Sequence, residues 1–223
     1  MEKQNEAIQE TTHAVRKLVA AVDEDPNNPQ VYYNLGSMLT ELKNYQQAEE
    51  LFKKALHFFK DNKQKAILHY GLGNVFYANG LYQEAIGEFQ KIKQDKLKLD
   101  ALLMIAQAEY AQNNYQVSLA YALTVAEQRN DHDSLMLLGE NFLALGNFSQ
   151  AEKYFDKVLS EWPNDEKANF QRGIIGLVAG EDNELFFEKV KKSNPEYFKK
   201  MKSRLVDVER FIAARKKDVQ GGK

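Results

Sequence analysis

The sequence predicts an all-α protein, a solenoid of antiparallel helix pairs, and two observations favour this fold. One pattern of glycine, aromatic and alanine residues returns five times, with its reference residues at Gly36, Gly73, Ala106, Gly139 and Gly173. Apolar residues recur at helical steps, and no alternating run of Val, Ile and Thr indicates a β-strand. Because each unit of a repeat array packs only on its neighbours, we expect one elongated array rather than separate globular domains.

The first, second and fourth copies of the pattern carry a family resemblance. They share a small residue between aromatic ones, and they read Tyr32, Leu35, Gly36, Leu39, Tyr45, Ala48, Phe52, Ala55; then Leu72, Gly73, Phe76, Gly80, Tyr82, Ala85, Phe89; then Leu138, Gly139, Phe142, Gly146, Phe148, Ala151, Phe155. With a period of about 34 residues, this order resembles the tetratricopeptide repeat. The resemblance implies a right-handed superhelical solenoid that acts by binding other proteins.

Proline, asparagine and aspartate residues set the expected helix boundaries, because proline cannot continue a helix and disfavours helical geometry in the residue before it. Such stops occur at 25–29, 162–165 and 193–195. In chain order we expect an incomplete repeat at 1–28, complete repeats at 29–62, 66–98, 99–131 and 132–165, and a degenerate repeat at 166–194. The remainder, 195–223, is expected to form a capping helix and a basic tail.

The third and fifth repeats depart from the pattern. The third has Ala106, Ser118 and Ala122 at the glycine, alanine and phenylalanine positions. The fifth keeps Gly173, but Lys189 stands where the packing phenylalanine is expected. Glycine lets two helices approach closely and phenylalanine fills the space between repeats, so we expect both repeats to pack differently from the others.

The last helix carries an apolar stripe at steps of three and four, formed by Tyr197 or Phe198, Met201, Leu205, Val208 and Phe211 or Ile212. An open solenoid exposes its last apolar face, and a terminal element with a polar outer side covers it. We therefore expect this helix to cap the array.

Composition excludes several classes of protein. The chain has no cysteine, so neither a disulfide nor a thiolate metal site is possible. Its N-terminal segment is charged and polar, and no apolar run approaches the roughly 20 residues that a membrane helix needs. The net charge of −2 excludes a globally basic nucleic-acid binder. We expect a cytoplasmic protein that does not insert into membranes.

Catalytic and metal-binding motifs are missing from the sequence. The histidines are scattered over different repeats without the paired spacing that would indicate a metal site; they are His13, His57, His69 and His132. No nucleophile elbow, phosphate loop or dinucleotide motif is present. We therefore expect a protein that is not an enzyme and that uses no cofactor.

A binding surface is expected on the first helix of each repeat. The resemblance implies that these helices line a concave groove that holds an extended peptide or a helix of a partner protein. Helical periodicity selects the residues that face away from the packing glycines. They are Tyr33, Asn34, Ser37, Tyr70, Gly71, Asn74, Tyr77, Leu103, Met104, Gln107, Tyr110, Met136, Leu137, Glu140, Phe170 and Gln171. The set is rich in Tyr, Met and Leu, and it has amides able to pair with a peptide backbone. Two interpretations stay open: an accessible groove, or burial of these residues within the protein.

Gly71 has two interpretations of its own. A missing side chain between Tyr70 and Asn74 would leave a notch for an apolar group of a ligand, or glycine would admit a neighbouring repeat. The two interpretations predict different effects of a larger side chain at this position. A side chain that fills a notch would leave the stability of the protein intact, whereas one forced into a packing contact would lower it.

The C-terminal segment supports an alternative function. The range 186–223 holds 12 Lys/Arg against 5 Asp/Glu, a net charge of +7, which leaves −9 for the range 1–185. Its basic residues include Lys191, Lys192, Lys199, Lys200, Lys202, Arg204, Arg210, Arg215, Lys216 and Lys217. They would suit a regulatory adaptor that docks on an acidic partner or nucleic acid, or they form the solvated side of the cap. No aromatic residues are interleaved for base stacking, which makes nucleic acid the less favoured partner; a homo-oligomer stays open.

Overall fold

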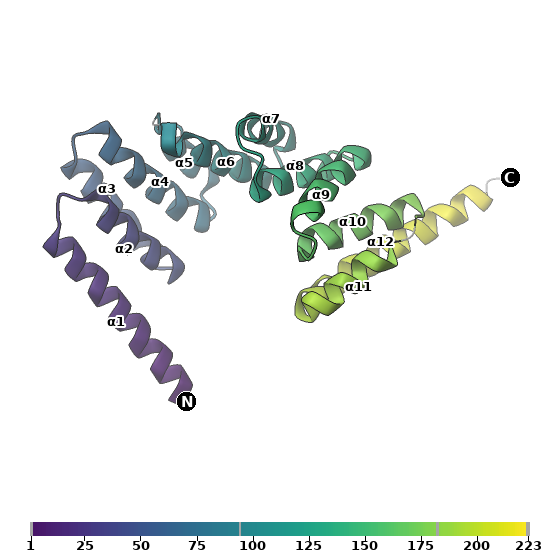
Figure 1. Ribbon diagram of the computed structural model, residues 1–223, viewed down its shortest axis with the longest axis horizontal. Helices are drawn as coiled ribbons and strands as arrows, with labels where there is room; N and C mark the ends of the chain where they lie inside the picture. The colour runs from purple at the N-terminus through teal and green to yellow at the C-terminus, as the bar shows by residue number, and fades with distance from the viewer. Residues whose placement is uncertain (1, 94, 182, 222–223) are drawn as a thin grey trace. The chain divides into compact units, whose positions relative to one another are not determined.

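The computed structural model describes residues 2–93, 95–181 and 183–221, and within them the chain forms twelve α-helices and no strand, as predicted (Figure 1). In order they are α1 (Glu2–Glu24), α2 (Pro29–Glu41), α3 (Tyr45–Phe58), α4 (Asn62–Ala78), α5 (Tyr82–Phe89), α6 (Asp95–Ala111), α7 (Tyr115–Ala126), α8 (His132–Ala144), α9 (Phe148–Glu161), α10 (Glu166–Ala179), α11 (Glu184–Ser193) and α12 (Pro195–Gly221).

The helices form two compact units, Met1–Val125 and Ala126–Lys223. In the first unit α2 pairs with α3 and α4 with α5, and the first helices of successive pairs, α2, α4 and α6, pack side by side. In the second unit α8 pairs with α9, α10 pairs with α11, and α12 packs on both α10 and α11. Each pair is the helix–turn–helix unit that the sequence predicts.

Local sequence signals explain the helix ends. The side chains of Asn28, Asp61, Asp131 and Asp165 accept hydrogen bonds from backbone N–H groups in the first turns of α2, α4, α8 and α10. Such caps satisfy donors that have no partner within the helix. The turns between paired helices contain a residue in the left-handed conformation, with φ between 60° and 77°, at Lys43, Gly80, Asn113, Gly146 and Gly180.

In four of the helix pairs an aromatic ring of the second helix packs directly on a glycine of the first helix, and we call this contact the lock of the pair. A Cβ atom on Gly73 would lie 2.5 Å from the ring of Phe89, and one on Gly139 would lie 2.7 Å from the ring of Phe155. Real side chains do not tolerate such distances, so these positions require glycine. In the first pair the ring of Phe52 packs on Gly36 of its own repeat and also on Gly71 of the next repeat.

The fifth repeat has the same lock, and the expectation about Lys189 is wrong. The ring of Phe187 lies 2.7 Å from the position of a Cβ on Gly173. Phe187 is two positions nearer to its glycine in the sequence than the packing rings of the other repeats are to theirs. Helix α11 begins four residues after its turn glycine, whereas α5 and α9 begin two residues after theirs. The packing ring of α11 is the fourth residue of the helix, whereas the packing rings of α5 and α9 are the eighth. The two changes together move the packing ring to Phe187.

The third repeat replaces the lock by two small residues. Ala106 and Ala122 are both fully buried, so a methyl group takes the place of the glycine hydrogen on one helix and the ring is absent from the other. Ser118, also fully buried, donates a hydrogen bond of 2.7 Å from Oγ to the carbonyl oxygen of Ala106. This bond satisfies the hydroxyl and ties α7 to α6.

The apolar stripe of α12 covers the end of the second unit. Tyr197, Phe198, Met201, Leu205 and Val208 pack against a cluster of buried residues on α10 and α11, which are Phe170, Ile174, Phe187 and Val190. The basic residues Lys199, Lys200, Lys202, Arg204 and Arg210 are exposed on the same helix. This is the arrangement expected of a capping helix.

Candidate binding surface

Nine predicted binding residues remain accessible on α2, α4 and α6 of the first unit. Asn34 is exposed, and the others are half-buried: Tyr33, Ser37, Tyr70, Asn74, Tyr77, Met104, Gln107 and Tyr110. Because α2 packs on α4 and α4 on α6, these residues line successive neighbouring helices. We call this set the tyrosine face.

Other aromatic rings support the tyrosines. Tyr77 packs edge-on against Tyr82 with ring centroids 5.5 Å apart, and the ring centroids of Tyr110 and Tyr115 are 5.2 Å apart in the same geometry. Tyr82 and Tyr115 begin the second helices of their pairs. The rings of Tyr33 and Tyr70 lie 6.5 Å apart across α2 and α4. The tyrosine face is thus held by contacts within the protein.

The amides of the tyrosine face differ in how they are satisfied. Asn34 Oδ1 accepts a hydrogen bond of 2.9 Å from Gln30 on the same helix. Asn74 Oδ1 is buried and has no hydrogen-bond partner among the described residues, although the residue as a whole is half-exposed. A buried carbonyl oxygen without a donor costs on the order of 1–3 kcal/mol. A ligand could supply this donor only after the Asn74 amide turns toward the surface, because the oxygen is buried where it lies.

Five other residues predicted for the binding surface are buried, namely Leu103, Met136, Leu137, Phe170 and Gln171. Phe170 has no exposed surface, and its ring packs edge-on against Phe187 and Tyr197. For Phe170 the second of the two interpretations holds, burial within the protein, because α12 covers the side of α10 on which it lies. Met136 packs in the core of the second unit.

The notch expected as one possibility at Gly71 does not exist. The ring of Phe52 occupies the space where a side chain would stand, with Cε1 2.5 Å from the position of a Cβ on Gly71. The glycine therefore serves the packing of α3 against α4, which is the second of the two interpretations.

Glu140 is half-buried on α8 of the second unit. Burial raises the pKa of its carboxyl group, and the positive charges of Lys167 and Arg204 oppose the shift. Arg204 belongs to α12, so the capping helix brings a basic group close to α8. Burial also raises the pKa of the Tyr197 hydroxyl, against the charge of the same arginine.

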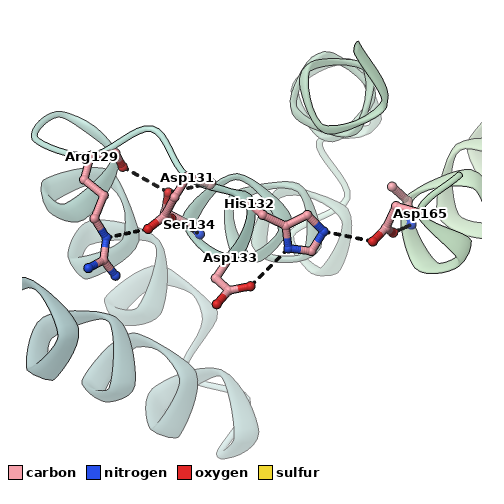
Figure 2. A network of polar contacts seen from close by, with 7 residues as sticks. Arg129, Asp131, His132, Asp133, Ser134 and Asp165 are labelled. Carbon is pink, nitrogen blue, oxygen red and sulfur yellow. Dashed lines mark hydrogen bonds and ion pairs between the residues drawn. The ribbon is translucent and has the colours of Figure 1, made fainter. Parts of the chain in front are cut away.

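A polar network at the start of α8 was missed at the sequence level (Figure 2). His132 Nε2 lies 2.8 Å from Asp165 Oδ2, and His132 Nδ1 lies 3.0 Å from Asp133 Oδ1. Burial lowers the pKa of the imidazole, but the hydrogen bonds to Asp133 and Asp165 outweigh it, so the pKa of His132 is raised. The histidine thereby bridges the N-termini of α8 and α10. The signal available in the sequence was the pair of capping residues, Asp131 and Asp165, one repeat apart.

Metal binding and membrane insertion find no support in the described residues. No group of three His, Asp or Glu side chains among them could hold a metal ion. None of the described helices is both long and apolar enough to span a bilayer.

Helix pairs with a glycine-and-aromatic lock define a class of helical-repeat proteins, and sequence comparison identifies the family. Tetratricopeptide repeat models match residues 27–94, 103–166 and 136–182, together more than half of the chain. The chain therefore belongs to the tetratricopeptide repeat proteins, which are protein–protein interaction scaffolds and are generally non-catalytic.

Solved structures share this fold at low sequence identity. The chain is 19% identical to YrrB, described as a TPR protein with an unusual peptide-binding site, with a TM-score of 0.59 over 84% of this chain and 97% of YrrB. It is 19% identical to the C-terminal part of a TPR protein from Cytophaga hutchinsonii, with a TM-score of 0.66 over 92% and 82%. It is 17% identical to pilF of Pseudomonas aeruginosa, with a TM-score of 0.66 over 90% and 95%. No curated protein matches the sequence.

Proposed function

We propose that the tyrosine face binds an extended segment of a partner protein, with Asn74 pairing to the backbone of that segment. The observation that carries this proposal is the buried Oδ1 of Asn74, which has no donor among the described residues. Rotation about the terminal side-chain torsion of asparagine exchanges its two ends at low cost. The amide can then accept from an N–H and donate to a C=O of the bound segment.

The aromatic rings supply contact area for the side chains of that segment. Tyrosine is enriched among the residues that dominate binding energy. Because Tyr82 and Tyr115 already restrain Tyr77 and Tyr110, binding costs little further side-chain entropy. YrrB, which shares this fold, has a peptide-binding site, and this supports peptide binding as the use of the fold here.

A second candidate function follows from the exposed basic side of α12, which would dock on an acidic partner. The side chains of Arg215, Lys216 and Lys217 lie outside the described residues, so the basic groups that support it are Lys199, Lys200, Lys202, Arg204 and Arg210. The salt dependence of binding separates the two functions. Affinity for the tyrosine face should change little between low and high salt, whereas affinity for the basic helix should fall steeply.

The test compares Asn74→Leu with Asn62→Leu, a change at an exposed residue at the start of the same helix. The wild-type chain captures its partner from lysate, and the bound region is reduced to a peptide for titration. Asn74→Leu should lower peptide affinity about tenfold, the equivalent of one hydrogen bond to a buried partner. It should leave the midpoint of unfolding unchanged or higher, because it removes an unsatisfied polar group. Equal affinity in both variants would contradict the proposal.

A further inference from the structure

A pocket in the first unit lies between the end of α5, the start of α6 and α7. Its volume is about 330 Å³, near the lower end of the range of ligand sites. Apolar side chains from three helices and the connecting turn line it, namely Phe89, Ile92, Ala101, Leu102, Ile105 and Tyr121. None of these residues belongs to the tyrosine face.

The pocket exists because α5 is short. The helix has 8 residues, against 14 in α3 and 14 in α9, which hold the same place in their pairs. Beyond Phe89 the chain continues in turns, with hydrogen bonds from Lys91 N to Glu88 O and from Ile92 N to Phe89 O. The opening therefore lies where further turns of helix would continue α5, and Ala101 and Ile105, which form its floor, are themselves buried.

The sequence of the third repeat makes this opening apolar. In the second repeat, His69 on α4 and Glu88 on α5 make a polar contact, with Nδ1 and Oε2 2.7 Å apart. Leu102 and Tyr121 stand at the equivalent positions of the third repeat, and both line the pocket half-buried. A polar contact between paired helices is thus replaced by two apolar side chains that face a pocket.

Lysines mark the rim of this pocket. Lys93 and Lys98 are exposed and belong to its lining, together with the exposed amide of Gln90. They lie in a part of the chain that is otherwise acidic, since the range 1–185 has a net charge of −9. An apolar floor with a cationic rim is complementary to a bulky apolar side chain flanked by carboxylates.

We propose that this pocket is a second binding site of the protein, and that it takes one bulky apolar side chain from an acidic segment of a partner protein. The apolar side chain enters between Leu102 and Tyr121, and neighbouring carboxylates pair with Lys93 and Lys98. The site is separate from the tyrosine face, so a single partner or two different partners can occupy both.

The test uses short fluorescein-labelled peptides and the full chain. The probe has one phenylalanine between pairs of glutamates, and two controls replace the phenylalanine by alanine or the glutamates by lysines. Fluorescence anisotropy should detect binding of the probe and loss of binding with either control. The lysine-flanked peptide binding as well as the probe would overturn the assigned charge of the partner.

Charge reversal on the rim supplies the matched variants. The double variant K93E/K98E should weaken binding of the probe about tenfold or more, because two attractive charge pairs become repulsive. The double variant K54E/K63E changes the net charge equally at exposed lysines of α3 and α4 outside the pocket, and should weaken binding less than threefold. Equal losses in the two variants would show a general charge effect and overturn the site.

Two further measurements locate the bound peptide. A benzoylphenylalanine version of the probe should cross-link to residues that line the pocket, such as Leu102 or Tyr121. Cross-links to α2, or to the tyrosine-face residues of α6, would overturn the proposal. Asn74→Leu should not change affinity for the probe. The proposals for the pocket and for the tyrosine face are therefore tested independently, and either can be rejected while the other holds. Displacement of a bound probe by decanoate would agree with an apolar pocket, but decanoate binding without any peptide binding would reject a protein partner.

Discussion

Gly71 offers a quantitative test of how the helix pairs pack. In Gly71→Ala the added methyl group would meet Cε1 of Phe52 at 2.5 Å and Cε2 at 3.1 Å. The ring cannot retreat, because it is fully buried and contacts Gly36 on its other side. The substitution should therefore force α3 and α4 apart or push the ring out of its preferred rotamer.

Two effects of opposite sign determine how much Gly71→Ala changes the free energy of unfolding. Replacing glycine by alanine inside a helix stabilises by about 1 kcal/mol, whereas overpacking a core costs about 1–3 kcal/mol. Gly87→Ala provides the matched control, since Gly87 is also inside a helix and no atom lies within 4 Å of the position of its Cβ. We expect Gly87→Ala to stabilise by up to about 1 kcal/mol. Gly71→Ala should be less stable than this control by about 1–3 kcal/mol, the overpacking cost alone.

Urea unfolding followed by helical circular dichroism measures both variants against the wild type. Placing Gly71→Ala in a Phe52→Leu background should remove most of its cost, because the smaller side chain leaves room for the methyl group. If Gly71→Ala raised the midpoint as much as Gly87→Ala, the ring would not hold the position on which this reasoning depends.

Two further outcomes are expected. The pKa of His132 is raised, so its bond to Asp165 stabilises fully below the ordinary histidine pKa of about 6.5 and progressively less as pH rises through the raised value. His132→Gln should accordingly lose more stability at pH 5.5 than at pH 8.5 in paired unfolding curves, and an equal loss at both would reject the ionised bridge. Removing 195–223 should expose Phe170 and Phe187, lower the melting temperature and promote self-association; a truncated chain that sediments as a monomer with unchanged melting would show that α12 does not cap the unit.

Local signals made the helices predictable, and contacts over longer range did not follow from them. Proline, capping and turn residues act within a few positions, so the pairs could be placed from the sequence. The ring of Phe187 was missed because α11 starts late after its turn and uses an earlier position for the ring, so the repeat spacing points elsewhere. The bridge from His132 to Asp165 joins residues of two successive repeats, so its signal in the sequence, two capping aspartates one repeat apart, is not a local one.

The candidate site was predicted in part for the same reason. Helical periodicity selects a face of each helix but does not show what covers that face. Tyr33, Tyr70 and Tyr77 remain accessible in the first unit. Phe170 has the same helical position as Tyr33 and Tyr70, yet α12 covers it. The pocket beside α5 depends on where a helix stops, and no glycine or proline marks that end.

The pairing of Ala106 with Ala122 has a consequence for how the chain unfolds. In a linear array, stability is close to a sum of repeat terms and neighbour terms, so cooperativity is limited by the weakest link. A buried phenylalanine contributes about 1.5–3 kcal/mol, and the third repeat lacks one at this position. Amide hydrogens of α7 should therefore exchange before those of α3 or α9, and the chain should open there before it unfolds globally. The division between the two compact units falls at the end of this same helix, after Val125. We therefore expect the array to open first at the third repeat, where two small side chains stand in place of a glycine and an aromatic ring.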